Sequence, residues 1–131
     1  MSDNSKRALA QAKEWLKTAE SALEDNRISE ETAAVACAEA IHSIIRANDA
    51  LTLKYLAKKT TRHDDAPYLF LELVKQKKIE KSDECFSELI MNAMRSKSGA
   101  DYGKDEFSRK DAEYFVTQAR QFIKMAERHL R

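Results

Sequence analysis

Apolar residues recur every three or four positions along five stretches of the chain, and this is the period of an amphipathic helix. The stretches cover about residues 4–24, 30–56, 67–78, 82–95 and 109–130. The second is the longest, and its alanine-rich start permits close approach of a neighbouring helix. No alternation typical of strands is present. The pattern predicts an all-α protein, an up-down four-helix bundle with one additional short helix.

The predicted helices begin at residues that suit a first turn. Ser29 and Ser108 can cap the second and the last helix, because a serine hydroxyl accepts a hydrogen bond from the unpaired amides there. Pro67, which follows two acids and an alanine, suits the start of the short helix because its missing N–H costs nothing in the first turn. We expect Ser82 or Asp83 to cap the fourth helix.

The inward-facing stripes define the expected core. Ile41 and Phe122 lie within the stripes of the second and the last helix, and Trp15 is expected to widen the stripe of the first. Cys37 and Cys85 lie in apolar segments and lack the spacing of a disulfide framework or a zinc site. We therefore expect both to be small buried thiols in a reducing compartment.

Composition limits the class of protein. With 131 residues and 43% hydrophobic residues, the chain can bury one core, and we expect a single domain over residues 1–131. The formal net charge is only +1, so any binding of nucleic acid has to come from local basic patches. No apolar run approaches the roughly 20 residues of a membrane span. We expect a cytoplasmic protein with no signal peptide and no membrane contact.

The two glycines of the chain lie close together, at Gly99 and Gly103. Glycine takes positive φ without steric cost, so the stretch from Arg95 to Gly103 is predicted to be a loop. Of all stretches of the chain, this is the one where we most expect a function beyond packing.

Metal and thiol chemistry are not favoured by the pattern. A di-metal bundle needs a Glu-x-x-His pair on each of two helices, and the chain has one such pair, Glu39 and His42. The two cysteines stand among apolar neighbours, unlike a reactive thiol. We expect no metal site and no cofactor.

A basic and polar set remains as the candidate binding site for RNA or a nucleotide, because cations at helix ends suit phosphates and a tyrosine can contact a base. Two alternatives stay open. In the first, these residues are solvated helix ends without a ligand. In the second, which concerns Arg46 alone, the arginine forms an intrahelical pair with Asp49. Arg109 is a further candidate. The set consists of Arg46, Lys54, Lys58, Arg62, His63, Arg95 and Tyr102.

Two stretches of this sequence resemble the HEPN superfamily, the higher eukaryotes and prokaryotes nucleotide-binding domain, whose members are small four-helix up-down bundles. The resemblance implies the same fold and a homodimer. The first stretch contains Met94, Arg95, Ala100, Asp101, Tyr102, Gly103, Phe107, Ser108, Asp111, Ala112, Ala119 and Phe122, and the second runs over residues 36–42 and 49–51.

The ribonuclease members of the superfamily share an arginine followed four to six residues later by a histidine, often with a tyrosine two positions further on. They cut RNA without a metal. In this sequence the arginine is Arg95 and the tyrosine is Tyr102, but the histidine position is Ala100. Alanine cannot donate or accept a proton, so this position cannot act as a general acid or base.

The resemblance and the residues together predict a non-catalytic binding module for RNA or a nucleotide. The resemblance places such modules in toxin–antitoxin or nucleotidyltransferase-associated systems, so an antitoxin or a nucleotidyltransferase is an expected partner. One alternative is a metal-independent ribonuclease of toxin type that uses Arg95 with a substitute base such as His63. Another is a protein-docking or scaffold bundle without a ligand.

Overall fold

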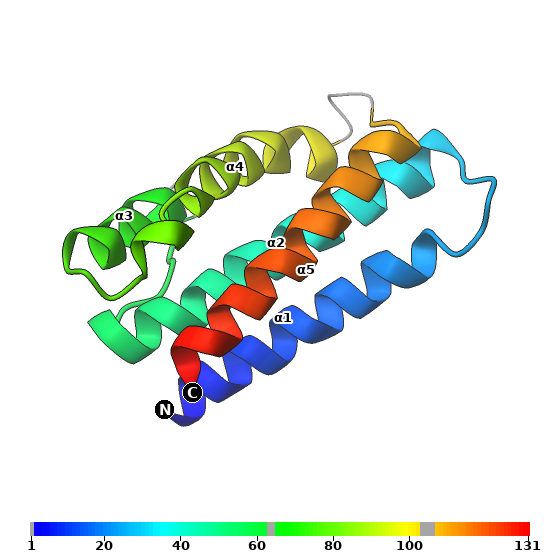
Figure 1. Cartoon of the computed structure of the whole chain (residues 1–131). Coiled ribbons are helices and arrows are strands. Elements are labelled where there is room, and N and C mark those ends of the chain that lie inside the picture. The colour runs from blue at the N-terminus through cyan, green and yellow to red at the C-terminus, as the bar shows by residue number, and fades with distance from the viewer. Residues whose placement is uncertain (1, 63–64, 103–106) are drawn as a thin grey trace.

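The computed structural model describes residues 2–62, 65–102 and 107–131, with the side chains of 98–102 excepted. Long helices α1, α2, α4 and α5 alternate in direction along the bundle, and short α3 joins α2 to α4 through the 3-10 turn η2 (Figure 1). This confirms the predicted all-α up-down bundle. The elements are α1 (Asp3–Ala22), α2 (Glu30–Leu56), α3 (Ala66–Lys75), η2 (Lys81–Asp83), α4 (Phe86–Tyr102) and α5 (Arg109–Leu130).

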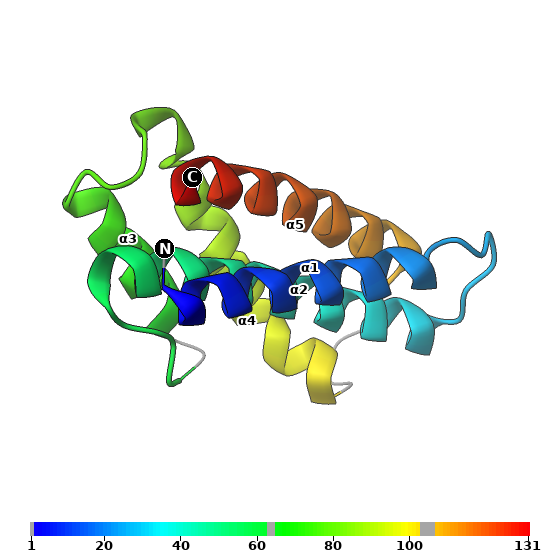
Figure 2. The same cartoon turned by 90° about the horizontal axis from the view of Figure 1, so that it is seen from below.

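Helix α2 is the central element and packs against α1, α3, α4 and α5. Figure 1 shows α1 on one side of α2 and α4 on the other, and Figure 2 shows α1 and α2 running side by side. Ala36, Ala40 and Ala47 of α2 are fully buried, which lets neighbouring backbones approach closely. Ile41 is also fully buried, as its position in the apolar stripe predicts.

Two buried serines fix α1 on α2. Ser43 Oγ donates a hydrogen bond to the Ala12 carbonyl at 2.8 Å, and Ser5 Oγ donates to the Ala50 carbonyl at 3.1 Å. Both serines are fully buried, so these bonds replace the water that each hydroxyl loses on folding. The two bonds join α1 to α2 at two different points along their length, so together they set the register of the antiparallel pair.

The starts of α2 and α5 agree with the predicted caps. Ser29 Oγ accepts a hydrogen bond from the Thr32 amide at 3.1 Å. Ser108 Oγ accepts from the Asp111 amide at 3.2 Å, and the Asp111 carboxylate accepts from the Ser108 amide at 2.9 Å, which completes a capping box. Each helix therefore begins where its own side chains satisfy the first amides.

The start of α4 was predicted wrongly. Ser82 and Asp83 lie in η2, and α4 begins only at Phe86. Asp83 is buried and its carboxylate contacts Arg128 and His129 of α5, so a tertiary contact occupies the group that was expected to cap the helix.

The end of α4 also differs from the prediction of a loop that starts at Arg95. The helix continues through Gly99 to Tyr102, while Gly103 lies outside the described residues. A single glycine inside a helix costs only about 1 kcal/mol relative to alanine. Among the residues that the structure describes, positive φ occurs at two that are not glycine, Ala57 and Lys77, which follow α2 and α3.

Two side chains expected in the core lie at the surface. Trp15 is 40% exposed, and its ring stacks on that of His42 with centroids 5.0 Å apart. Cys85 is exposed, because it lies in the turn before α4 and not within the helix. Cys37 is buried as predicted, and burial, assisted by the charge of Asp111, raises the pKa of its thiol to about 12, so it stays protonated and unreactive.

Side chains from other helices cover two helix C-termini. The Arg109 guanidinium donates to the Leu23 carbonyl at 2.6 Å and also to that of Asp25, at the end of α1. Lys54 donates to the His129 carbonyl at 3.1 Å, and the Tyr55 hydroxyl donates to the same oxygen, at the end of α5. Cationic donors at these ends also offset the negative end of the helix dipole.

Within the part of the chain that the structure describes, no helix has both the length and the apolar content that crossing a bilayer requires.

The aromatic centre of the bundle allows a direct test of the packing. Phe122 is fully buried and contacts the rings of Phe70 and Phe86, at centroid distances of 6.0 and 5.5 Å. We expect Phe122→Ala to lower the free energy of unfolding by about 3–5 kcal/mol in urea denaturation, because it leaves a cavity. The exposed neighbour Gln121 is the control, and Gln121→Ala should change stability little. A loss below about 0.5 kcal/mol for Phe122→Ala would contradict the packing, since surface substitutions reach that size.

Candidate functional site

The sequence-predicted site residues fall on different elements of the structure. Lys58 and Arg62 are exposed in the segment that follows α2, and Arg95 is exposed on α4. His63 lies outside the described residues, and Tyr102 and Ala100 belong to α4 with side chains outside the description. Their roles as binding or catalytic residues stay predictions.

Two of the predicted cations take part in packing. Lys54 contacts the end of α5, and its ammonium lies 4.9 Å from the centre of the Tyr55 ring. Arg46 donates to Asp49 Oδ2 at 2.9 Å and to Gln11 Oε1 at 2.6 Å. The intrahelical pair of Arg46 and Asp49, one of the two alternatives for this part of α2, is therefore present.

Asp49 also organises the segment after α2. Its side chain is almost fully buried, and its Oδ1 accepts a hydrogen bond from the Thr60 amide at 3.0 Å while Oδ2 binds Arg46. One carboxylate thus holds a cation of α2 and the backbone of the following segment. Lys59, the neighbour of Thr60, is placed beside Arg46 by this contact.

A first groove, called here the cationic groove, lies where the start of α1 meets the end of α2. Its volume is about 350 Å³. Arg7 comes from α1, Arg46 from α2 and Lys59 from the segment after α2, and no acidic residue is among the described residues of its lining. The lining consists of Asn4, Arg7, Arg46, Leu53, Ala57 and Lys59.

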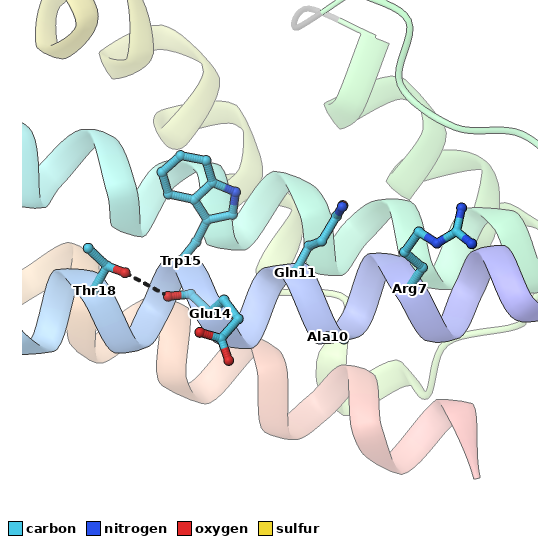
Figure 3. A pocket seen from close by; sticks show the side chains of 6 residues that line it. All are labelled: Arg7, Ala10, Gln11, Glu14, Trp15 and Thr18. Atoms are coloured by element: carbon cyan, nitrogen blue, oxygen red, sulfur yellow. Dashed lines mark hydrogen bonds between the residues drawn. The ribbon is translucent and has the colours of Figure 1, made fainter.

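A second groove, called here the Trp15 groove, runs along the outer face of α1 and has a volume of about 520 Å³. Figure 3 shows Trp15, Gln11 and Arg7 rising on the same side of α1, toward α2. Arg7 lines both grooves, so the two adjoin at this residue. The lining consists of Arg7, Ala10, Gln11, Glu14, Trp15 and Thr18.

Sequence analysis missed Arg7, Trp15 and Lys59 as site residues. Arg7, Gln11 and Trp15 follow a spacing of four, which places them on one face of α1. That signal is visible in the sequence, but Trp15 was assigned to the core because it also flanks the apolar stripe. Lys59 stands in the basic run after α2, where its neighbours Lys58 and Arg62 were chosen instead.

A separate cluster of polar side chains lies where the end of α5 meets η2. His129 Nε2 is 3.0 Å from Asp83 Oδ2, and Arg128 donates to Asp83 Oδ1 at 3.1 Å. Glu80 lies beside them, and one ligand atom from each of Glu80, Asp83 and His129 lies within 4.8 Å of the others. The side chain of His129, in the last turn of α5, is largely buried in this contact.

Glu39 and His42, the Glu-x-x-His pair of the sequence, do not form such a cluster. Within residues 2–62, 65–102 and 107–131, they belong to no group of three side chains that could hold one metal ion. Glu39 is buried on α2, and this burial raises the pKa of its carboxyl group above the ordinary value of 4.5.

The chain therefore has the architecture of a helical bundle that carries a joined cationic and aromatic surface. Comparison with protein families gives a match to the HEPN domain over residues 5–129. The chain belongs to the HEPN family, which points to a function related to nucleotides or RNA. No protein with a curated description matches it.

The buried carboxyl group of Glu39 predicts a dependence of stability on pH. Its raised pKa means that the folded state binds the proton more tightly than the unfolded chain, so stability is lost as the pH rises from the ordinary value of 4.5 through the folded pKa. We expect Glu39→Gln to raise the melting temperature at neutral pH, and the gain should shrink as the pH falls toward 4.5. The exposed Glu24 is the control, because Glu24→Gln should show no such trend. A melting temperature that Glu39→Gln leaves unchanged or lowers at neutral pH would contradict the assignment.

Proposed function

We propose that the chain is a non-catalytic module that binds RNA or a nucleotide across the cationic groove and the Trp15 groove. The observation that carries the proposal is the meeting of three cations from three chain segments beside an exposed indole. Membership of the HEPN family supports the ligand class.

The cationic groove has the chemistry of a phosphate site. Arg46 is oriented by its bonds to Gln11 and Asp49, and a guanidinium has five N–H donors, so the remaining donors can serve a phosphate. Arg7 and Lys59 are exposed and add charge without a fixed partner geometry. When a phosphate binds there, the protein cations replace the counterions that accompany the phosphate in solution. The affinity should therefore fall as the salt concentration rises.

The Trp15 groove has the chemistry of a base platform. The indole packs against His42 and exposes 40% of its surface, so a base can stack on the exposed part. Stacking on an aromatic side chain suits any base, because every base has a π-face. Arg7 joins the two grooves, so one nucleotide can place its phosphate and its base on neighbouring parts of the same surface.

The proposal includes no reaction. The motif position occupied by histidine in the ribonucleases is Ala100 in this chain, and alanine has no proton to exchange. Arg95 is exposed on α4 and is therefore available to a phosphate. Residue 100 offers no side chain that could act beside it as a general base.

Binding is tested with short single-stranded RNA and with mononucleotides. The chain has one tryptophan, so quenching of its fluorescence reports contact at Trp15 directly. We expect quenching on binding, weaker binding for Trp15→Ala by about 1–3 kcal/mol, and no comparable effect for the control Tyr68→Ala, an exposed aromatic of α3. Binding that leaves the fluorescence unchanged and tolerates Trp15→Ala would exclude this surface.

The phosphate contacts are tested by the salt dependence of the same binding. Arg7→Ala and Lys59→Ala should each lower the slope of log affinity against log salt by about one. Lys124→Ala, which removes an exposed cation of α5, is the matched control and should leave the slope unchanged. Equal slopes for all three variants would contradict phosphate binding in the cationic groove.

The same samples test the absence of a reaction. RNA incubated with the protein in chelator should remain intact while it binds. Discrete cleavage products that disappear in Arg95→Ala or His63→Ala would show an active ribonuclease instead. Neither cleavage nor binding would favour the docking or scaffold alternative.

We also propose the homodimer that the family resemblance implies, with an antitoxin or a nucleotidyltransferase as the type of partner protein. Light scattering at micromolar concentration tests the dimer, and a single species of monomer mass would contradict it.

A further inference from the structure

The cluster at the end of α5 brings together one imidazole and two carboxylates from distant parts of the chain. His129 comes from α5, Asp83 from η2, and Glu80 is the residue directly before η2. Glu80 precedes this turn by one residue, and its carboxylate lies near that of Asp83. Among the described residues no other three such side chains converge in this way.

The distances suit a small metal ion. Asp83 Oδ2 and His129 Nε2 are 3.0 Å apart, and one ligand atom of Glu80 completes a set within 4.8 Å. Two ligands at the usual bond lengths around tetrahedral zinc lie about 3.3 Å apart. The spacing of the pair is close to that of two ligands of one ion, and the exposed Glu80 can rotate to meet it.

Neighbouring groups already hold the two buried ligands in place. The side chains of Asp83 and His129 are only 8% and 9% exposed. Arg128 binds the second oxygen of Asp83, and Lys54 and Tyr55 bind the carbonyl of His129, which fixes the last turn of α5. Outer contacts of this kind orient ligands in known metal sites.

We propose that Glu80, Asp83 and His129 form a binding site for a divalent ion of zinc type. The two carboxylates offset the charge of the ion in part, because Arg128 also binds Asp83, and three protein ligands leave a fourth position for water. The imidazole selects against magnesium and calcium, which prefer oxygen ligands throughout. The ion joins α5 to the connection between α3 and α4, so its effect is on stability, and the site does not depend on the proposed binding of RNA.

The test uses metal-free full-length protein in a Cys85→Ser background, which removes the one exposed thiol. Zn²⁺ and Co²⁺ should raise the melting temperature, whereas Mg²⁺ should not. Co²⁺ should give visible absorption bands, and Zn²⁺ should shift the imidazole signals of His129 in NMR spectra. Glu80→Gln should weaken Zn²⁺ binding by at least about tenfold, the loss that follows even from removal of an outer contact.

Glu80→Gln keeps the test sharp because the side chain is exposed and its replacement leaves the buried contact of Asp83 and His129 in place. The matched control is the exposed Glu88, and Glu88→Gln should bind Zn²⁺ as the parent does. His129→Gln should abolish binding. The proposal is overturned if Zn²⁺ does not bind, if Glu80→Gln and Glu88→Gln bind it equally well, or if Mg²⁺ stabilises the protein as much as Zn²⁺.

Discussion

A polar side chain buried inside a helical bundle has to find its hydrogen-bond partner within the protein, and this constraint governs α2. Ser43 donates to a carbonyl of α1, and Asn48 donates to the first carbonyl of α3. Asp49 accepts from the amide of Thr60 in the segment that follows α2. An unmade bond of this kind costs about 1–3 kcal/mol, so each contact selects one placement of the segment that supplies the partner. The apolar stripes bring the helices together, and the polar groups of α2 decide how they are aligned.

The same constraint builds the candidate site. Asp49 uses one oxygen for Arg46 and the other for Thr60, so the backbone that carries Lys59 is fixed next to a cation whose orientation is also fixed. The register set by Ser43 brings Trp15 of α1 opposite His42 of α2. The phosphate-binding and base-stacking parts of the proposed surface therefore follow from the packing of α1 on α2. A change at Asp49 disturbs both the core and the cationic groove, and is a poor probe of binding for that reason.

Sequence patterns predicted the helices well where the signal is local. The hydroxyl groups of Ser29 and Ser108 act on amides within their own first turns, so no other part of the chain can alter the result. The predicted start and end of α4 were wrong. The Asp83 carboxylate contacts His129 of α5 and does not cap α4, and Gly99 lies within the helix. Ala57, which is not a glycine, has positive φ, and the Lys58 amide there bonds to the Thr52 carbonyl and closes the end of α2. Tertiary contacts outweigh a preference of about 1 kcal/mol at such positions.

The candidate sites depend on pairings that no single segment encodes. The face of α1 with Arg7 and Trp15 can be derived from helical spacing, but its meeting with Lys59 requires the antiparallel register of two helices. The contact of Asp83 with His129 joins residues 46 positions apart, and helical periodicity alone does not bring them together. Lys54 and Tyr55 of α2 hold the end of α5 by donating hydrogen bonds to the His129 carbonyl in its last turn. Lys54, which the sequence suggests as an RNA contact, thus also holds the end of α5, and residue type alone does not reveal this packing role.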